Sequence, residues 1–281
     1  MAKRMLRLSF ISLTVLLTSV SLNAQYYYKD ILSNLQLNKE FSVLKNTQVK
    51  NIKLNSFEDN DEPSADFFCE KKINKDYSQS QMISRSYITG ESLLVTDYNS
   101  SGKIVKSTTT TPTTTNVVKY EYNDQGQLSL VSTSTSADGD SNGITETHEF
   151  TYDQERKLQK MLRKKNNVLI STITFLKDEH GNIIEEDPAG KSNDKKYFYY
   201  YNDQNQLTDV VHFNERAQRL LPDYMFEYNE NGLPKQMISI DETASNYFIW
   251  KYAYTPKNLV EIQKCFSKEK RLLGTIQYDY K

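Results

Sequence analysis

Histidines, cysteines and recurring asparagine–aspartate pairs are the residues of this 281-residue chain that could bind a metal or carry out chemistry. The three histidines, His148, His180 and His212, lack the His-x-x-x-His or His-x-x-Glu-His spacing that is typical of a zinc site. His180 lies in a polar turn at residues 178–182, and we expect all three side chains at the surface or in turns. The histidines therefore predict neither a metal site nor a catalytic base.

The asparagine–aspartate pairs could suggest calcium, because carboxylate and amide oxygens are its usual ligands. They occur in short polar segments such as Asn123-Asp124-Gln125-Gly126. Tight hairpin turns need the same residues, since an Asx side chain bonds to its own backbone and glycine accepts a positive φ. We therefore favour turns over calcium.

Two cysteines, Cys69 and Cys265, could form a disulfide in an exported protein and would then tie the N-terminal segment to the last part of the chain. Nothing in the sequence places the two sulfur atoms within bonding distance. Two buried thiols that never meet are the favoured expectation. No Cys-x-x-Cys motif is present, so thioredoxin-type chemistry is not predicted.

Motifs of known enzyme classes are absent from the sequence. It has no glycine-rich phosphate loop, no nucleophile elbow and no Ser-His-Asp signature. A pair of carboxylates that meets only in the folded chain would leave no motif, so a hydrolase stays an alternative. We expect a protein that is not an enzyme and has no cofactor.

The polar turns belong to a repeat of tyrosine, turn and leucine, as in Tyr122, the turn at residues 123–126, and Leu128. The last aromatic residue before each turn recurs at intervals of 23 to 30 residues. These residues are Tyr98, Tyr122, Tyr152, Phe175, Tyr201, Tyr228, Tyr254 and Tyr278. Such a period indicates one supersecondary unit repeated along the chain.

The unit is predicted to be a β-hairpin. Val118, Tyr120 and Tyr122 alternate with polar residues, as in a half-buried strand, and leucine begins the return strand. Leu233 and Leu259 follow their tyrosines one residue sooner than Leu128 does, which predicts loops with and without an extra bulge residue. The fold class is all-β, a long antiparallel meander of about 15 strands that curls into a barrel or half-barrel.

The sequence divides into three parts. Residues 1–24 are predicted to be a signal peptide, residues 25–90 lack a clear repeat, and residues 91–281 are predicted to form the repeat domain. We expect the segment 25–90 to extend the sheet or to pack on its aromatic face. Two low-complexity tracts at residues 107–115 and 132–143 are predicted to be solvated loops.

The N-terminal part predicts export. Lys3, Arg4 and Arg7 precede a short apolar stretch, and a small residue, Ala24, stands before Gln25, where we expect cleavage. The mature chain would lie in the periplasm, on the outer-membrane surface or outside the cell. Without the three basic residues its net charge is −4, which gives no electrostatic reason to expect nucleic acid.

The repeat resembles the YD repeat of Rhs-type bacterial shell proteins, which consists of a Tyr-Asp pair, a glycine-containing turn and a leucine. Tyr152-Asp153 and residues 122–128 carry this resemblance, which extends over residues 85–281. The chain also resembles small secreted Bacteroidetes proteins of unknown function that have a porin-like β fold. The resemblance implies hairpin repeats and a porin-like barrel, and it implies no particular function.

Taken together, these features favour an exported, non-enzymatic β-scaffold whose tyrosine-rich concave face binds a glycan, a peptide or a cell-envelope protein. An outer-membrane pore is an alternative. We do not expect membrane insertion, because the return strands carry charges such as Lys160 and Asp209 two residues after their leucines.

Overall fold

The computed structural model describes residues 25–87, 89–137, 143–189, 194–241 and 246–281. The predicted signal peptide and residues 138–142 of one predicted loop lie outside the described residues. A π-helical segment, η1 (Tyr27–Leu32), continues into the α-helix α1 (Ser33–Asn46). The strands are β1 (Asn51–Phe57), β2 (Phe68–Ile73), β3 (Gln79–Ser86), β4 (Gly90–Tyr98), β5 (Ile104–Thr110), β6 (Thr114–Tyr122), β7 (Leu128–Ala137), β8 (Ile144–Tyr152), β9 (Leu158–Lys165), β10 (Val168–Lys177), β11 (Ile183–Ala189), β12 (Tyr197–Tyr201), β13 (Leu207–Asn214), β14 (Arg219–Tyr228), β15 (Pro234–Asp241), β16 (Asn246–Tyr254), β17 (Val260–Phe266) and β18 (Leu272–Tyr280).

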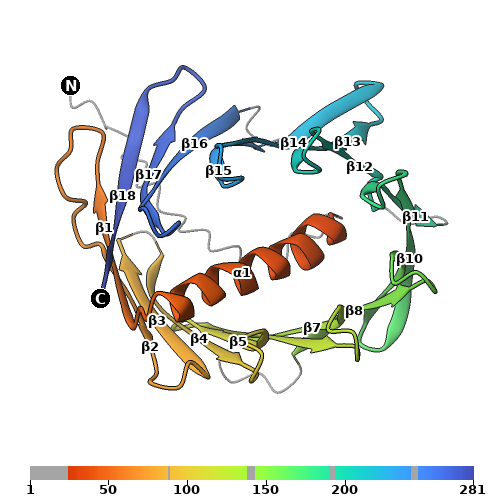
Figure 1. The fold of residues 1–281 in the computed structure, drawn as a ribbon, viewed down its shortest axis with the longest axis horizontal. Coiled ribbons are helices and arrows are strands. Elements are labelled where there is room, and N and C mark those ends of the chain that lie inside the picture. The colour runs from red at the N-terminus through yellow and green to blue at the C-terminus, as the bar shows by residue number, and fades with distance from the viewer. Residues whose placement is uncertain (1–24, 88, 138–142, 190–193, 242–245) are drawn as a thin grey trace.

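The strands form a closed barrel (Figure 1). Each strand pairs antiparallel with the next one along the chain, and β1 pairs antiparallel with β18 to complete the ring. Closure removes the free strand edges that an open sheet would expose. The predicted antiparallel meander is confirmed, and the repeat region supplies the 15 strands from β4 to β18.

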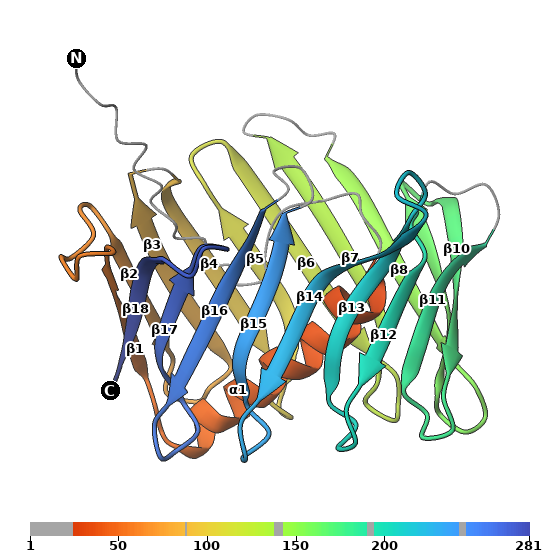
Figure 2. The same ribbon diagram turned by 90° about the horizontal axis from the view of Figure 1, so that it is seen from above.

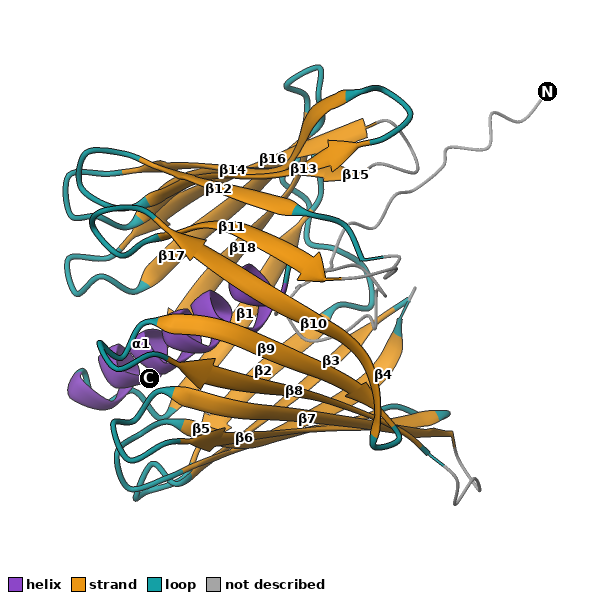
Figure 3. Cartoon of the chain, turned by 90° about the vertical axis from the view of Figure 1, so that its right-hand side faces the viewer, coloured by secondary structure: helices purple, strands orange, loops and turns teal. Residues whose placement is uncertain are grey.

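The segment 25–90 supplies η1, α1 and the remaining strands β1 to β3. A ring of 18 strands encloses a lumen that its wall side chains alone cannot fill. The helix lies inside that ring, between the wall of β14 to β16 and the wall of β6 to β8 (Figures 1 and 2). It lies nearer the end of the barrel that carries the repeat turns (Figure 3).

This internal helix was not predicted from the sequence. On α1, Phe41 and Leu44 are buried, whereas Leu35 is 59% exposed. Apolar residues therefore do not form the continuous stripe that identifies an amphipathic helix. The helix is stabilised by the barrel around it and not by a clear sequence pattern.

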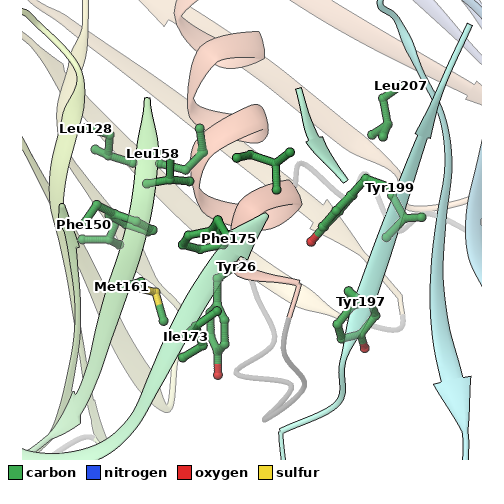
Figure 4. Close-up of a cluster of buried hydrophobic side chains, with 14 of the residues drawn as sticks. Tyr26, Leu128, Phe150, Leu158, Met161, Ile173, Phe175, Tyr197, Tyr199 and Leu207 are labelled. Atoms are coloured by element: carbon green, nitrogen blue, oxygen red, sulfur yellow. The ribbon is translucent and has the colours of Figure 1, made fainter. Parts of the chain in front are cut away.

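Two clusters of buried side chains hold the helix to the wall. The first surrounds Tyr26 and Ile31 and includes Phe150, Met161 and Ile173 from β8 to β10 (Figure 4). The second surrounds the C-terminal half of α1 and is built on Phe41, Leu44 and wall residues that include Ile52, Leu54 and Tyr98. The core of the protein is thus the contact between the helix and the inner wall.

The turns use their Asx side chains to bond to the backbone, as predicted. Asn123 Oδ1 accepts hydrogen bonds from the backbone N–H groups of Gln125 and Gln127, at 3.1 and 2.8 Å. The same pair of bonds occurs at Asp153, Asp178, Asn202 and Asn229. The turn interpretation accounts for these oxygens without a bound cation.

The turns that follow the repeat tyrosines have the same length in each copy compared below. The prediction of two loop types is therefore wrong. Tyr122 pairs with Leu128, Tyr228 pairs with Pro234 and Tyr254 pairs with Val260, each the sixth residue after the tyrosine. The same register shift occurs before each tyrosine, with one extra residue in the return strand, so all three copies carry the bulge. Proline and valine simply take the position that leucine has elsewhere.

The low-complexity tracts are also largely strand and not loop. Thr108, Thr109 and Thr110 belong to β5 and residues 132–137 belong to β7. Threonine is β-branched and packs well on a pleated surface, which explains why a polar tract can extend the sheet. Residues 138–142 of the second tract are outside the described part of the chain.

The repeat tyrosines join successive strands through a series of hydrogen bonds. Six of their hydroxyls each donate to the carbonyl oxygen of the first residue of the preceding return strand, over 2.6 to 2.8 Å. The pairs are Tyr122 with Ile104, Tyr152 with Leu128, Tyr201 with Ile183, Tyr228 with Leu207, Tyr254 with Pro234 and Tyr280 with Val260. In the last copy the bond comes from Tyr280 and not from Tyr278. These hydroxyls stabilise the barrel and are not available to a ligand.

Substituting Tyr201 with phenylalanine is expected to lower the free energy of unfolding by about 1 kcal/mol, because the Ile183 carbonyl loses its donor. Chemical denaturation measures the change. Tyr200→Phe is the control, since this neighbouring ring lies 47% exposed on the outer face. Equal stability of Tyr201→Phe and the unmodified protein would show that the hydroxyl contributes nothing.

Candidate functional site

The cysteines are free thiols, so the structure does not contain the disulfide that was one alternative. Cys69 lies on β2 and Cys265 on β17, and the strands β1 and β18 lie between them. Three strand spacings of about 4.8 Å keep them well beyond the Cα separation that a disulfide allows. Burial raises the pKa of each thiol to about 12, so neither is a reactive thiolate.

The expectation of surface or turn positions is right for His180 and wrong for the other two histidines. The side chain of His180 is 63% exposed in its turn. His212 is fully buried, and the side chain of His148 is 14% exposed. Both face the barrel interior and have acidic partners there, Asp30 and Glu146 for His148 and Asp223 for His212.

His148 connects the internal helix to the wall. Its Nδ1 atom lies 2.6 Å from Asp30 Oδ2 on η1, and its Nε2 atom lies 3.0 Å from Glu146 Oε1 on β8. Burial alone would lower the pKa of His148, but the two carboxylates raise it to about 9. The imidazole is therefore protonated at neutral pH and forms an ion pair across the interface.

Arg163 extends this network along the wall. Its Nε atom donates to Glu146 over 2.8 Å and its Nη1 atom donates to Asp194 over 3.0 Å. Burial opposes ionisation of Glu146, yet His148 and Arg163 together lower the pKa of Glu146 to about 2. Each of these charges has an opposite partner, so the network has the character of an anchor and not of a poised acid and base.

The network predicts a defined pH range of stability. The pKa of His148 is raised to about 9, so its contribution is full below about pH 6.5 and is lost as the pH rises through 9. The pKa of Glu146 is lowered, so its contribution is full above about pH 4.5 and is lost as the pH falls toward 2. Urea denaturation across this range should show greatest stability between about pH 4.5 and 6.5. Stability that rises from pH 6.5 to 9 would contradict the ion pair.

The side of α1 that faces away from Phe41 and Leu44 stays accessible to solvent inside the barrel. Leu35, Gln36, Lys39 and Glu40 are exposed, although the wall surrounds the helix (Figure 1). The surrounding barrel partly desolvates the accessible Glu40 carboxylate and so raises its pKa, while the nearby Lys71 ammonium on β2 acts to lower it. Burial lowers the pKa of Lys71 in turn. Glu40 and Lys71 therefore form an acidic and a basic group within the lumen.

Aromatic rings from β16 face the interior of the barrel. Trp250 pairs with Met237 on β15, which pairs with Phe226, a ring that packs on the first core cluster. Residues paired in this way project to one side of a sheet, so Trp250 and Tyr252, two residues along β16, point inward. Both rings are half-buried. The pKa of Tyr252 is raised by burial and also by the negative charge of Glu40, which places these two groups near each other.

A hollow of about 350 Å³ adjoins Tyr252 at the end of the barrel. It opens between the turns β14–β15 and β16–β17 and is lined by Asn229, Asn231, Lys235 and Tyr254 as well as Tyr252. The Tyr254 hydroxyl is already bonded to Pro234. Tyr252 thus links the hollow to the interior, and we refer to Glu40, Lys71, Trp250 and Tyr252 as the lumen site.

Sequence reasoning missed the charged members of the lumen site. Lys71 shares the inward face of β2 with Cys69 and Ile73, and a lysine between two apolar residues of one parity was a signal that could have found it. Glu40 left no signal, because the helix itself was not predicted. The predicted concave aromatic face corresponds to the inner wall, although most of its tyrosine hydroxyls are used within the fold.

No group of histidine, cysteine, aspartate or glutamate side chains in the described parts of the chain is arranged to hold a metal ion. Within the same residues, no helix is long and apolar enough to cross a membrane.

No family model and no curated protein matches the chain. Among solved structures it is similar to a porin-like protein from Bacteroides uniformis, with 12% identity and a TM-score of 0.40 over 83% of this chain and 98% of that one. A porin-like protein from Bacteroides vulgatus has 9% identity and a TM-score of 0.28 over the same shares. The complex TcdB2-TccC3 without its hypervariable C-terminal region has 9% identity and a TM-score of 0.34, over 73% of this chain and 12% of that one. These similarities are weak, and the barrel assignment rests on the strand pairing of the chain itself.

Proposed function

We propose that the protein is an exported, non-enzymatic β-barrel that binds a glycan at the lumen site. The observation that carries the proposal is that the half-buried rings of Trp250 and Tyr252 face the lumen, with Tyr252 near Glu40 on the accessible face of α1. Aromatic rings stack on the apolar faces of sugars, and a few polar groups fix their hydroxyls. Glu40 and Lys71 provide an acceptor and a donor, and Asn231 lies in the adjoining hollow.

Trp250 is the only tryptophan in the chain, so its fluorescence reports on this site alone. Titration of the protein with a panel of neutral and acidic oligosaccharides is expected to give a saturable change in emission with at least one sugar. Tyr252→Ala should weaken that binding about tenfold or more, whereas Tyr200→Ala on the outer face should not change it. A saturable emission change with peptides alone would identify the ligand as a peptide and not a glycan. No emission change with either class would overturn a binding role for the lumen.

The proposal places the barrel in the cell envelope or outside the cell, and not within a lipid bilayer. Exposed lysines face outward in register, Lys106 beside Lys119 on β5 and β6 and Lys251 beside Lys264 on β16 and β17. Each cation near the middle of a bilayer would cost about 2 to 4 kcal/mol. A carbonate wash of isolated membranes should release the protein, and retention in the pellet would favour the pore.

The hydrolase alternative is less well supported by the arrangement of the interior carboxylates. Glu146 and Asp194 are paired with Arg163, and Asp223 lies 3.0 Å from the Nδ1 atom of His212. A glycosidase needs two carboxyl groups that reach the substrate. These carboxylates are already bonded to buried partners, which favours a structural role for them.

A further inference from the structure

A fully buried carboxylate, Glu186 on β11, receives the beginning of the described chain. The backbone N–H groups of Gln25, Tyr26 and Tyr27 donate to it over 3.0, 3.1 and 3.0 Å, and the Tyr199 hydroxyl donates over 2.7 Å. These are the first N–H groups of the internal helix, which have no partner within the helix itself. Glu186 therefore caps the helix from the wall of the barrel.

The surroundings of Gln25 are those of a chain start. Gln25 is 4% exposed, and its side-chain amide donates to Asp223. Its backbone φ is 100°, which is strained for a residue other than glycine, and a residue that begins a chain has no φ to strain. Its Oε1 atom is buried without a hydrogen-bond partner in the described structure.

We propose that Glu186 is the receptor for the α-ammonium group of Gln25, which forms when the chain is cut before this residue. Hydrolysis breaks the amide bond between residues 24 and 25, and water supplies the carboxylate of residue 24 and the amine of Gln25. The amine takes up a proton, because an α-amino group has a pKa of about 8. The single backbone N–H of Gln25 thereby becomes an ammonium group with three N–H donors. The buried Glu186 carboxylate then has a cation in direct contact.

This ion pair would stabilise the junction that has the fewest residue pairs among the described parts of the strands. Within the described residues, β11 and β12 share two pairs, Glu185 with Phe198 and Glu186 with Tyr197, whereas β1 and β18 share six. Glu186 and Tyr199 come from the two sides of this junction, and Gln25 to Tyr27 bind between them. The cut has to precede closure of the barrel, since a protease cannot reach a residue that is 4% exposed. Processing is thereby coupled to the insertion of the helix.

The first test identifies the chain start of the exported protein by intact mass and N-terminal sequencing. The expected result is an unmodified Gln25. A start at another residue, or the loss of ammonia that marks cyclisation of Gln25, would overturn the proposal.

The second test compares the exported protein with a form that keeps residues 23 and 24 ahead of Gln25. The unfolding equilibrium constant of the extended form is expected to be about tenfold larger or more, because the ion pair is absent. In Glu186→Gln the two forms should differ much less, whereas in Glu185→Gln, a change on the outer face of the same strand, the full difference should remain. If the extension raises the unfolding equilibrium constant as much in Glu186→Gln as in the unmodified protein, the ion pair is excluded.

A third measurement does not require the variants to fold. An amine-specific reagent at mildly acidic pH should leave Gln25 of the native exported protein unlabelled and should label it in urea. Equal labelling in both states would show an accessible N-terminus and would contradict the proposal. None of these measurements depends on a ligand, so their outcome is separate from that of the Trp250 titration.

Discussion

Substituting Asp30 with asparagine is expected to lower the free energy of unfolding by about 3 kcal/mol, because it leaves the buried His148 without its closest counter-ion. Asp30 lies on the helix and His148 on the wall, so the change weakens the connection between the two. The side chains are 15% and 14% exposed, which means that water cannot replace the lost partner. Urea denaturation at pH 6 measures the effect.

A second readout separates the ion pair from a loss of packing. In Asp30→Asn the pKa of His148 should fall from about 9 toward its ordinary value, which NMR titration of the imidazole would show. The decline in stability between pH 6.5 and 9 should shrink accordingly. Asp203→Asn, in an exposed turn, is the control and should change stability by less than about 0.5 kcal/mol. An unchanged pKa of His148 would mean that Asp30 does not interact with the imidazolium.

The sequence was sufficient to predict the wall of the barrel because each hairpin carries its own local instructions. Alternating residues such as Val118, Tyr120 and Tyr122 define a strand, and Asn123 and Gly126 define the reversal. These signals act over fewer than about ten residues, and they recur with small variations along the repeat region. Repetition therefore made the number of strands in the repeat region predictable.

The contents of the barrel depend on long-range contacts and were not predictable in the same way. Asp30 meets His148, and Gln25 meets Glu186, across more than 100 residues of sequence. The closing pair of β1 and β18 brings Ile52 beside Tyr280. None of these three contacts leaves a motif, because each partner lies in an ordinary local context. The lumen site combines a helix that lacks a regular apolar stripe with residues from several strands, so it could be found only in the folded chain.

The internal helix should be the element whose docking depends most on a single ring. Phe41 is 2% exposed and stacks on Tyr98 of β4, with ring centroids 3.4 Å apart and an interplanar angle of 4°. It also contacts Tyr77 edge-on at 6.3 Å. Replacing Phe41 with alanine is expected to cost about 4 kcal/mol, because it removes the buried ring and leaves a cavity between helix and wall.

Leu35→Ala is the matched control for Phe41→Ala, since it removes an apolar side chain from the same helix at a position that is 59% exposed. It should change stability by less than about 0.5 kcal/mol. Amide hydrogen exchange shows where the loss occurs: in Phe41→Ala the amides of α1 should exchange well before those of the wall strands, because the strands keep their ladder of hydrogen bonds while the helix loses its main contact. If helix and wall amides instead accelerate together, the helix is an integral part of the barrel core, and the ring of strands cannot persist without it.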